Sequence, residues 1–173
     1  AIEDTVAIVT APEDDTDSLN SGSCYIYELI DDEWVFVQKI IPETEITEGQ
    51  FGASCVIHHG RIAIGAPGMN KVFIYEKIGE VWTEAFVISK PFGIASQMDL
   101  YNDRLVFNGA GAYIYERFEE EWVEITNLKD IITESDPNFG RSLAVWDDYV
   151  MVGSPRIAGP SYFEKGMVWV FKK

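Results

Sequence analysis

The sequence is poor in cysteine, histidine and basic residues, and it contains no long apolar run. Two cysteines and two histidines occur among 173 residues. Two cysteines do not make a disulfide framework. The apolar stretches fall well short of the roughly 20 residues needed to cross a bilayer. No signal peptide is present, which leaves open whether a targeting segment was removed or never included.

Basic residues are outnumbered, with 13 Lys and Arg against 29 Asp and Glu, a formal net charge of −16. A surface with that field repels phosphate backbones and anionic lipids. We therefore expect no nucleic-acid partner and no membrane insertion, and we interpret the acidity as a solubility feature. Cys24 and Cys55 lie in predicted strands at positions that are apolar in related segments, so we expect buried free thiols.

What the sequence does contain is a repeat, which is most complete over residues 51–91. This segment predicts four short strands in series, opened by Phe51-Gly52 and interrupted by Gly65-Ala66-Pro67. Polar turns of two to five residues join these strands, and such turns connect antiparallel neighbours. The unit is therefore predicted to be a four-stranded antiparallel sheet.

The Phe-Gly pair recurs at residues 51, 92 and 139, and the Trp that opens the fourth strand recurs at 34, 82 and 122. A period of roughly 40 to 50 residues with four strands per unit is typical of a propeller blade. We predict an all-β chain, a β-propeller of about four blades of four antiparallel strands each. The approximate blades span residues 1–50, 51–91, 92–138 and 139–173. The first is expected to lack strand one, with Ala1–Glu3 as its tail, and the last to lack strand four.

The repeated residues also have predicted structural roles. Each Phe of the Phe-Gly pairs is expected to pack between adjacent blades. The Gly that follows lets backbones approach closely. Pro at the end of the second strand has no N–H to leave unpaired where the chain leaves the sheet.

These motifs resemble the FG-GAP repeat family, the blade unit of the integrin α-subunit headpiece. The matching residues are Phe51-Gly52, Phe92-Gly93, Phe139-Gly140, Gly65-Ala66-Pro67 and Gly153-Ser154-Pro155, with Thr10-Ala11-Pro12 and Gly109-Ala110-Gly111 as degenerate copies. The resemblance covers nearly the whole chain. It implies a β-propeller with a binding or scaffolding role, usually extracellular or at the cell surface.

Integrin-type blades also carry DxDxDG-like calcium loops, and the nearest segment here is residues 14–20. Asp15, Asp17 and Asn20 are its candidate metal ligands. Leu19 occupies a ligand position, however, and the Gly needed for the sharp turn is absent. A solvated acidic loop is therefore favoured over a calcium site, and no other cofactor is expected.

An enzyme is not predicted. The acidic residues lie mostly in hairpin turns, where solvent keeps the pKa values of carboxyl groups in their ordinary range. General acid–base catalysis needs carboxyl groups brought together in a pocket. The sequence has no G-x-S-x-G elbow and no phosphate loop. His58 and His59 permit a metal or acid–base reading, but we interpret them as exposed turn residues.

Exposed aromatic residues are the remaining candidates for ligand binding. Trp146 lies beside a predicted turn, and Tyr162 and Phe163 lie in a loop of the last repeat. Aromatic rings on propeller loops stack on sugars or anchor peptides. For all three residues, local packing is the favoured interpretation and ligand binding is the alternative.

The resemblance points to a non-enzymatic module for protein–protein interaction or adhesion, and a carbohydrate-binding propeller lectin is the alternative. Uncovered blade edges are an aggregation hazard that proteins normally cover. The chain alone could close a small ring, two copies could form a larger homo-oligomeric ring, or the chain could be part of a longer array. We expect a larger ring, by assembly or within a longer chain.

Overall fold

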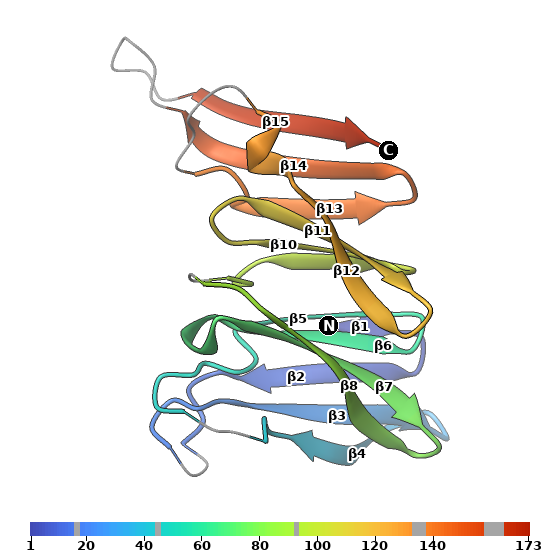
Figure 1. Ribbon diagram of the computed structural model, residues 1–173. Helices are drawn as coiled ribbons and strands as arrows, with labels where there is room; N and C mark the ends of the chain where they lie inside the picture. The colour runs from blue at the N-terminus through green and yellow to red at the C-terminus, as the bar shows by residue number, and fades with distance from the viewer. Residues whose placement is uncertain (16–17, 44–45, 92–93, 133–137, 158–164) are drawn as a thin grey trace. The chain divides into compact units, whose positions relative to one another are not determined.

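The computed structural model describes residues 1–173 except 16–17, 44–45, 92–93, 133–137 and 158–164. Its strands form four antiparallel sheets (Figure 1). Helical structure in the described residues is limited to two 3-10 segments, η1 (Pro67–Met69) and η2 (Leu128–Asp130). Neither is long or apolar enough to cross a membrane. The all-β class is confirmed, while the blade count and the closure of a ring stay predictions.

The chain divides into two compact units, Ala1–Ser96 and Gln97–Lys173. In the first unit, sheet 1 consists of β1 (Ile2–Glu3), β2 (Val6–Ala11), β3 (Ser23–Ile30) and β4 (Glu33–Ile40). Sheet 2 consists of β5 (Ser54–His58), β6 (Arg61–Ala66), β7 (Lys71–Ile78) and β8 (Val81–Ser89). In both sheets the order in space is the order in sequence, as successive hairpins require.

In the second unit, sheet 3 consists of β9 (Met98–Tyr101), β10 (Arg104–Asn108), β11 (Ala112–Phe118) and β12 (Glu121–Asn127). Sheet 4 has three strands, β13 (Ser142–Trp146), β14 (Tyr149–Ile157) and β15 (Lys165–Lys172). The predicted absence of a fourth strand in the last repeat is confirmed for the described residues.

The turns between the first and second strands of sheets 2, 3 and 4 share one backbone feature. His59, Asn102 and Asp147 have φ values of 48°, 51° and 50°. Asn, Asp and His are the non-glycine residues most often found in this left-handed region. The tight polar turns predicted at these three places are therefore confirmed.

Sheet 1 differs from the prediction, because it has four strands and not three. Ile2 pairs with Ala7 and Glu3 pairs with Val6, which makes β1 a two-residue outer strand. Asp4, at φ 48°, lies in the turn that joins β1 to β2. The short segment expected to be only the tail of an absent strand thus forms its own ladder.

Two of the Gly-Ala-Pro-like motifs also differ from the prediction. Pro155 lies inside β14 and does not end it, and the strand accommodates the ring through a register shift between Ser154 and Ile157. A proline within a strand is usually found at such an irregularity. In sheet 3, pairing of Arg104 with Glu116 corresponds to pairing of Arg61 with Glu76 in sheet 2. That alignment moves the Gly109-Ala110-Gly111 copy one residue out of register with Gly65-Ala66-Pro67.

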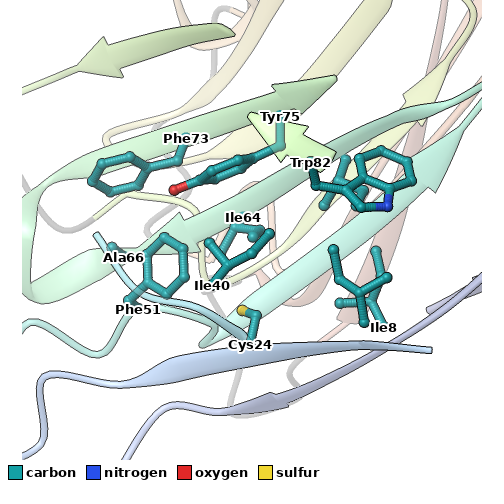
Figure 2. Close-up of a cluster of buried hydrophobic side chains, with 11 residues drawn as sticks. Ile8, Cys24, Ile40, Phe51, Ile64, Ala66, Phe73, Tyr75 and Trp82 are labelled. Atoms are coloured by element: carbon teal, nitrogen blue, oxygen red, sulfur yellow. The ribbon is translucent and has the colours of Figure 1, made fainter. Parts of the chain in front are cut away.

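Phe51 packs between sheets 1 and 2, as predicted. Its side chain is fully buried, and its ring meets the ring of Phe73 edge-on at 5.2 Å between centroids. Figure 2 shows Phe51 beside Ala66, with Cys24 of sheet 1 in the same cluster. The cluster draws on both sheets and includes Ile8, Cys24, Ile26, Ile40, Phe51, Ile62, Ile64, Ala66, Phe73, Tyr75 and Trp82.

Phe139 has the same role in the second unit. It is buried in a cluster that contains Val106 of sheet 3 and Val152 of sheet 4. Its ring meets that of Trp169 edge-on at 5.1 Å. The third Phe-Gly pair, Phe92-Gly93, lies outside the described residues.

The glycines of the two described Phe-Gly pairs adopt a conformation that other residues rarely take. Gly52 and Gly140 have φ values of 93° and 91°. A Cβ on Gly52 would lie 3.0 Å from the Cβ of Thr10, and a Cβ on Gly140 would lie 3.1 Å from the carbonyl oxygen of Gly111. Glycine is therefore required at both positions by backbone conformation and by close packing.

Neither cysteine forms a disulfide. Cys24 is fully buried, as predicted, and its burial raises the pKa of its thiol. Cys55, which was also expected to be buried, is only partly buried on β5.

Candidate functional site

Strand register assigns equivalent side chains to the two faces of every sheet. The leading face carries the central cross-strand pair Ile8–Ile26 in sheet 1 and its equivalent Val106–Ile114 in sheet 3. The trailing face carries Val9–Tyr25 in sheet 1, Ile64–Phe73 in sheet 2 and Val152–Trp169 in sheet 4. Successive residues of a strand point to opposite faces, so these pairs define the two sides of each sheet.

Within each unit, the leading face of the earlier sheet packs on the trailing face of the later one. In the first unit, Ile8 and Ile26 share a core with Ile64 and Phe73. In the second unit, Val106 and Ile114 share a core with Val152, and Trp169 packs against it. The same aliphatic-to-aromatic packing is therefore used twice.

The trailing face of sheet 1 is open. Val9 is 57% exposed, although its equivalent Ile64 is fully buried. Phe36 is 50% exposed and packs edge-on against Tyr27 at 5.8 Å between ring centroids. Trp34, at 44% exposed, extends this apolar surface along β4. The exposed residues of this face are therefore mainly aromatic and aliphatic.

The leading face of sheet 4 is open as well. Its central pair is Met151–Val170, the equivalent of Ile8–Ile26. Met151 and Val170 are 47% and 59% exposed, and neighbouring Val168 is 65% exposed. A shallow apolar pocket of about 330 Å³ lies on this face and is lined in part by Ala144, Trp146, Tyr149, Met151 and Val170.

Ion pairs connect neighbouring sheets at equivalent positions. Lys77 of sheet 2 lies 2.7 Å from a carboxylate oxygen of Glu28 in sheet 1, and Lys173 lies 2.7 Å from a carboxylate oxygen of Glu116 in sheet 3. The register places Lys172 of sheet 4 at the position of the glutamates. It places Leu29 of sheet 1 at the position of the lysines. The two open faces thus lack the charges used between packed sheets.

A polar pocket of about 230 Å³ lies at the turn end of sheets 3 and 4. Its most buried charge is Glu116, whose side chain is 11% exposed. Arg104 donates from Nε and Nη2 to one oxygen of Glu116, at 2.9 and 2.7 Å, and from Nη1 to the carbonyl oxygen of Asp147. Burial raises the pKa of Glu116, but hydrogen bonds from Lys173 and Arg104 outweigh it and hold the pKa below its ordinary value.

Aromatic rings adjoin this pocket. Tyr101 lines it, and the ring of Trp146 lies 6.2 Å from the Tyr101 ring. Trp146 is 63% exposed, so the predicted ligand-binding ring is on the surface and not packed into the core. Tyr162 and Phe163, the other two predicted ligand-binding residues, lie outside the described residues.

The acidic loop of sheet 1 is held by its own hydrogen bonds. A carboxylate oxygen of Asp15 accepts the backbone N–H of Asn20 at 2.7 Å, and the Asn20 side chain donates to Glu48 at 3.0 Å. The structure therefore brings Asp15 and Asn20 together, with one Asp15 oxygen and the Asn20 amide nitrogen bonded to protein groups. Asp17, the third predicted metal ligand, lies outside the described residues.

Asp14, a carboxylate of this loop that the metal prediction did not include, has three side-chain hydrogen-bond partners. Asp14 accepts hydrogen bonds from Ser23 at 2.6 Å, from Tyr25 at 3.1 Å and from Lys39 at 3.0 Å. The Ser23 hydroxyl is the largest cause, with Lys39 next, of a fall in the pKa of Asp14 from 3.8 to about 2.

Of the two histidines, only His58 differs from the prediction of exposed turn residues. His59 is exposed, but His58 is half-buried, and its Nδ1 lies 3.1 Å from a carboxylate oxygen of Glu3 in β1. The His58 and His59 rings stack at 4.1 Å between centroids. No local sequence signal connects Glu3 with the histidines, because they are far apart in the chain and are brought together by the contact of β1 with β5.

Comparison with known proteins adds no family assignment. No model of a protein family matches the chain, and a search of curated proteins found no significant match. The FG-GAP resemblance therefore depends on the repeated motifs of this sequence.

Proposed function

We propose that this chain is a non-enzymatic binding and scaffold module, built from FG-GAP-type β-propeller blades, that associates with protein through its open sheet faces. The observation that carries the proposal is the exposure of the trailing face of sheet 1 and the leading face of sheet 4. The family resemblance adds an extracellular or cell-surface location and an adhesion-type role to this proposal.

The partner that fits these faces best is a second copy of the chain. In both units a leading face carrying an aliphatic pair packs on a trailing face carrying aromatic rings. The open faces are one of each kind, with Met151 and Val170 on sheet 4 and Tyr25 and Phe36 on sheet 1. Sheet 4 of one copy would therefore pack on sheet 1 of the next, repeating the contact made within each unit.

The charged positions are compatible with this contact. Lys172 occupies the strand position that holds Glu28 and Glu116 in the packed pairs of sheets. In the proposed contact it would face Leu29, which occupies the position of the basic residues Lys77 and Lys173. A lysine at both positions would bring like charges together, and Leu29 avoids that repulsion. Trp34 pairs with Leu29 on the same face, so its ring is available to the Lys172 ammonium group.

The contact is heterologous, since it joins two different faces. Such a contact closes into a ring or continues into an open chain of subunits. Each buried Val or Met side chain contributes about 1.5–3 kcal/mol, and association costs roughly 4–15 kcal/mol. For a face with a few such residues, we therefore expect a dissociation constant in about the micromolar range.

Two complementary variants test the proposal on the whole chain. Val9→Glu places a charge on the trailing face, and Val170→Glu places one on the leading face. Wild type should increase in mass from about 1 to about 100 µM in analytical ultracentrifugation, and each variant alone should stay monomeric. A mixture of the two should form a 1:1 dimer, because one intact face of each kind remains.

Ile78→Glu is the matched control, since Ile78 is 67% exposed but lies at the tip of the β7–β8 hairpin. It should associate as wild type does. Circular dichroism should show that all three variants keep the wild-type strand content. A wild type that stays monomeric throughout, or a mixture of the face variants that does not pair, would contradict the second copy as partner.

A carbohydrate is the second candidate ligand, supported by the exposed Trp146 ring beside the polar pocket. Tyr101, Asn102 and Asp103 line that pocket together with the charged groups of Arg104 and Glu116. An aromatic face next to fixed polar groups is the arrangement that sugar rings bind. A glycan array with wild type and Trp146→Ala tests this candidate. Binding of a defined glycan that the variant loses would support it, and an array with no bound glycan would reject it.

A further inference from the structure

The side chains of Glu3, His58 and His59 converge at the edge where β1 lies beside β5. Each offers one ligand atom, and these atoms lie within 4.8 Å of one another. Two of them are already close, since His58 Nδ1 and a Glu3 oxygen are 3.1 Å apart. The cluster joins a strand of sheet 1 to a hairpin turn of sheet 2 and takes no part in the contacts between sheet faces proposed above.

Turn formation does not explain this cluster. The turn requires a residue with a left-handed backbone conformation at position 59, and the equivalent turns have Asn102 and Asp147 at that place. His59 alone is thus an acceptable turn residue. His58 is different, because its position is occupied by Tyr101 and Trp146 in sheets 3 and 4, and a carboxylate oxygen of Glu3 in sheet 1 lies 3.1 Å from its Nδ1.

We propose that Glu3, His58 and His59 form a binding site for a divalent transition-metal ion of the Zn²⁺ type. Imidazole nitrogen and carboxylate oxygen are ligands that Zn²⁺ accepts, at about 2.0–2.2 Å each. Ligand atoms in a tetrahedral site are then roughly 3.4 Å apart. The Glu3–His58 pair already has such a spacing, and rotation of the His59 ring out of its stack brings in the third nitrogen. Water completes the coordination.

This set of ligands also determines which metal binds. Ca²⁺ and Mg²⁺ prefer oxygen ligands, so two imidazoles select against them. The net charge of −16 attracts cations of either type to the surface. A bound ion would connect β1, which has only two residue pairs with β2, to the turn between β5 and β6. Metal binding should therefore stabilise the fold.

The test is calorimetric titration of the chelator-treated whole chain with ZnCl₂, followed by thermal unfolding. Wild type should bind one Zn²⁺ per chain and unfold at a higher temperature with the metal. Co²⁺ should give visible d–d absorption without the near-ultraviolet band of a thiolate ligand, which separates this site from binding at Cys55. Ca²⁺ should give neither heat nor a shift.

Glu3→Gln, His58→Ala and His59→Ala should each weaken Zn²⁺ binding by about tenfold or more. Asp147→Asn, which removes a carboxylate from the equivalent turn of sheet 4, should bind Zn²⁺ as wild type does. Circular dichroism of the metal-free variants should match wild type, and Glu3→Gln keeps the size of the side chain in case a histidine variant unfolds. Absence of Zn²⁺ binding by wild type, a thiolate band with Co²⁺, or unchanged binding by Glu3→Gln would overturn the proposal.

Discussion

The side-chain amide of Gln38 in sheet 1 bonds both backbone groups of Trp82 in sheet 2. It donates to the Trp82 carbonyl oxygen at 2.8 Å and accepts the Trp82 N–H at 2.9 Å. Trp82 lies on β8, an outer strand of its sheet, so these groups have no neighbouring strand to pair with. One glutamine thus completes the hydrogen bonding of a strand edge in the adjacent sheet.

Gln38→Ala should lower the free energy of unfolding by about 1–3 kcal/mol, because it leaves a buried N–H and C=O without partners. Chemical denaturation measures the change. Gln97→Ala, at an exposed glutamine, is the control and should leave the midpoint unchanged. Equal midpoints for Gln38→Ala and wild type would show that water replaces the amide without cost.

Glu116 should make the stability of the chain depend on acid pH. Its hydrogen bonds from Lys173 and Arg104 lower its pKa below 4.5 against the opposing effect of burial. A carboxylate with a lowered pKa contributes stability that is present above its unfolded-state pKa and is lost as pH falls through its folded-state pKa. The contribution should therefore be complete at pH 7 and disappear below pH 4.5.

Glu116→Gln should lower the free energy of unfolding by about 2 kcal/mol at neutral pH, and the difference from wild type should shrink in acid. Lys173 is 60% exposed, so salt should weaken its share of the effect more than that of the buried Arg104. Urea denaturation at pH 7 and at about pH 3 measures both differences. Glu120→Gln, in the exposed β11–β12 turn, should change neither.

Asp14 should remain ionised at lower pH than an ordinary aspartate, because its pKa is lowered. Hydrogen bonds from Ser23 and Lys39 are the main causes that lower its pKa to about 2. The stability that follows is present above pH 3.8 and is lost as pH falls to about 2. Carbon-detected NMR titration of the Asp14 carboxyl should give a midpoint near 2. In Lys39→Met the midpoint should rise, and an unchanged midpoint would contradict the role of the ammonium group.

Strand positions, hairpin turns and the burial of Phe51 and Phe139 could be predicted because neighbouring residues encode them. Alternation, turn residues and the repeated Phe-Gly pairs are all local signals. The two-residue strand β1 was missed because Ile2–Glu3 is too short to carry an alternation signal. Pro155 was expected to end its strand because a proline alone does not reveal a bulge.

Less of the candidate site could be predicted, because it depends on residues far apart in sequence. The sequence around His58 predicts a turn residue, whereas the structure places Glu3 of β1 beside it. The open faces of sheets 1 and 4 carry the same residue types as the packed faces, and only the arrangement of the sheets shows which are covered. Trp146 interrupts the repeat pattern, and its ring is exposed although local packing was the favoured interpretation.

Calcium should not stabilise the loop of residues 14–20. One carboxylate oxygen of Asp15 and the amide nitrogen of Asn20 already bond to protein groups, and residues 14–20 lack the glycine that a calcium-binding turn requires. Thermal unfolding with millimolar CaCl₂ and with the chelator EGTA should give the same midpoint. If calcium raises the midpoint and Asp15→Asn removes that increase, the loop is a calcium site after all.

Phe51→Ala should be the most destabilising of the substitutions considered, because Phe51 is fully buried between sheets 1 and 2. Removing a buried Phe side chain costs about 3–5 kcal/mol, which includes the cavity left beside Phe73 and Tyr75. Gly22 and Gly52 hold the backbone on either side, since a Cβ on Gly22 would lie 2.2 Å from the Phe51 carbonyl oxygen. The chain therefore has little freedom to collapse into the cavity.

Phe118→Ala, at a residue 53% exposed in the β11–β12 hairpin, should cost far less in the same denaturation experiment. Equal losses from the two substitutions would mean that Phe51 does not hold sheets 1 and 2 together.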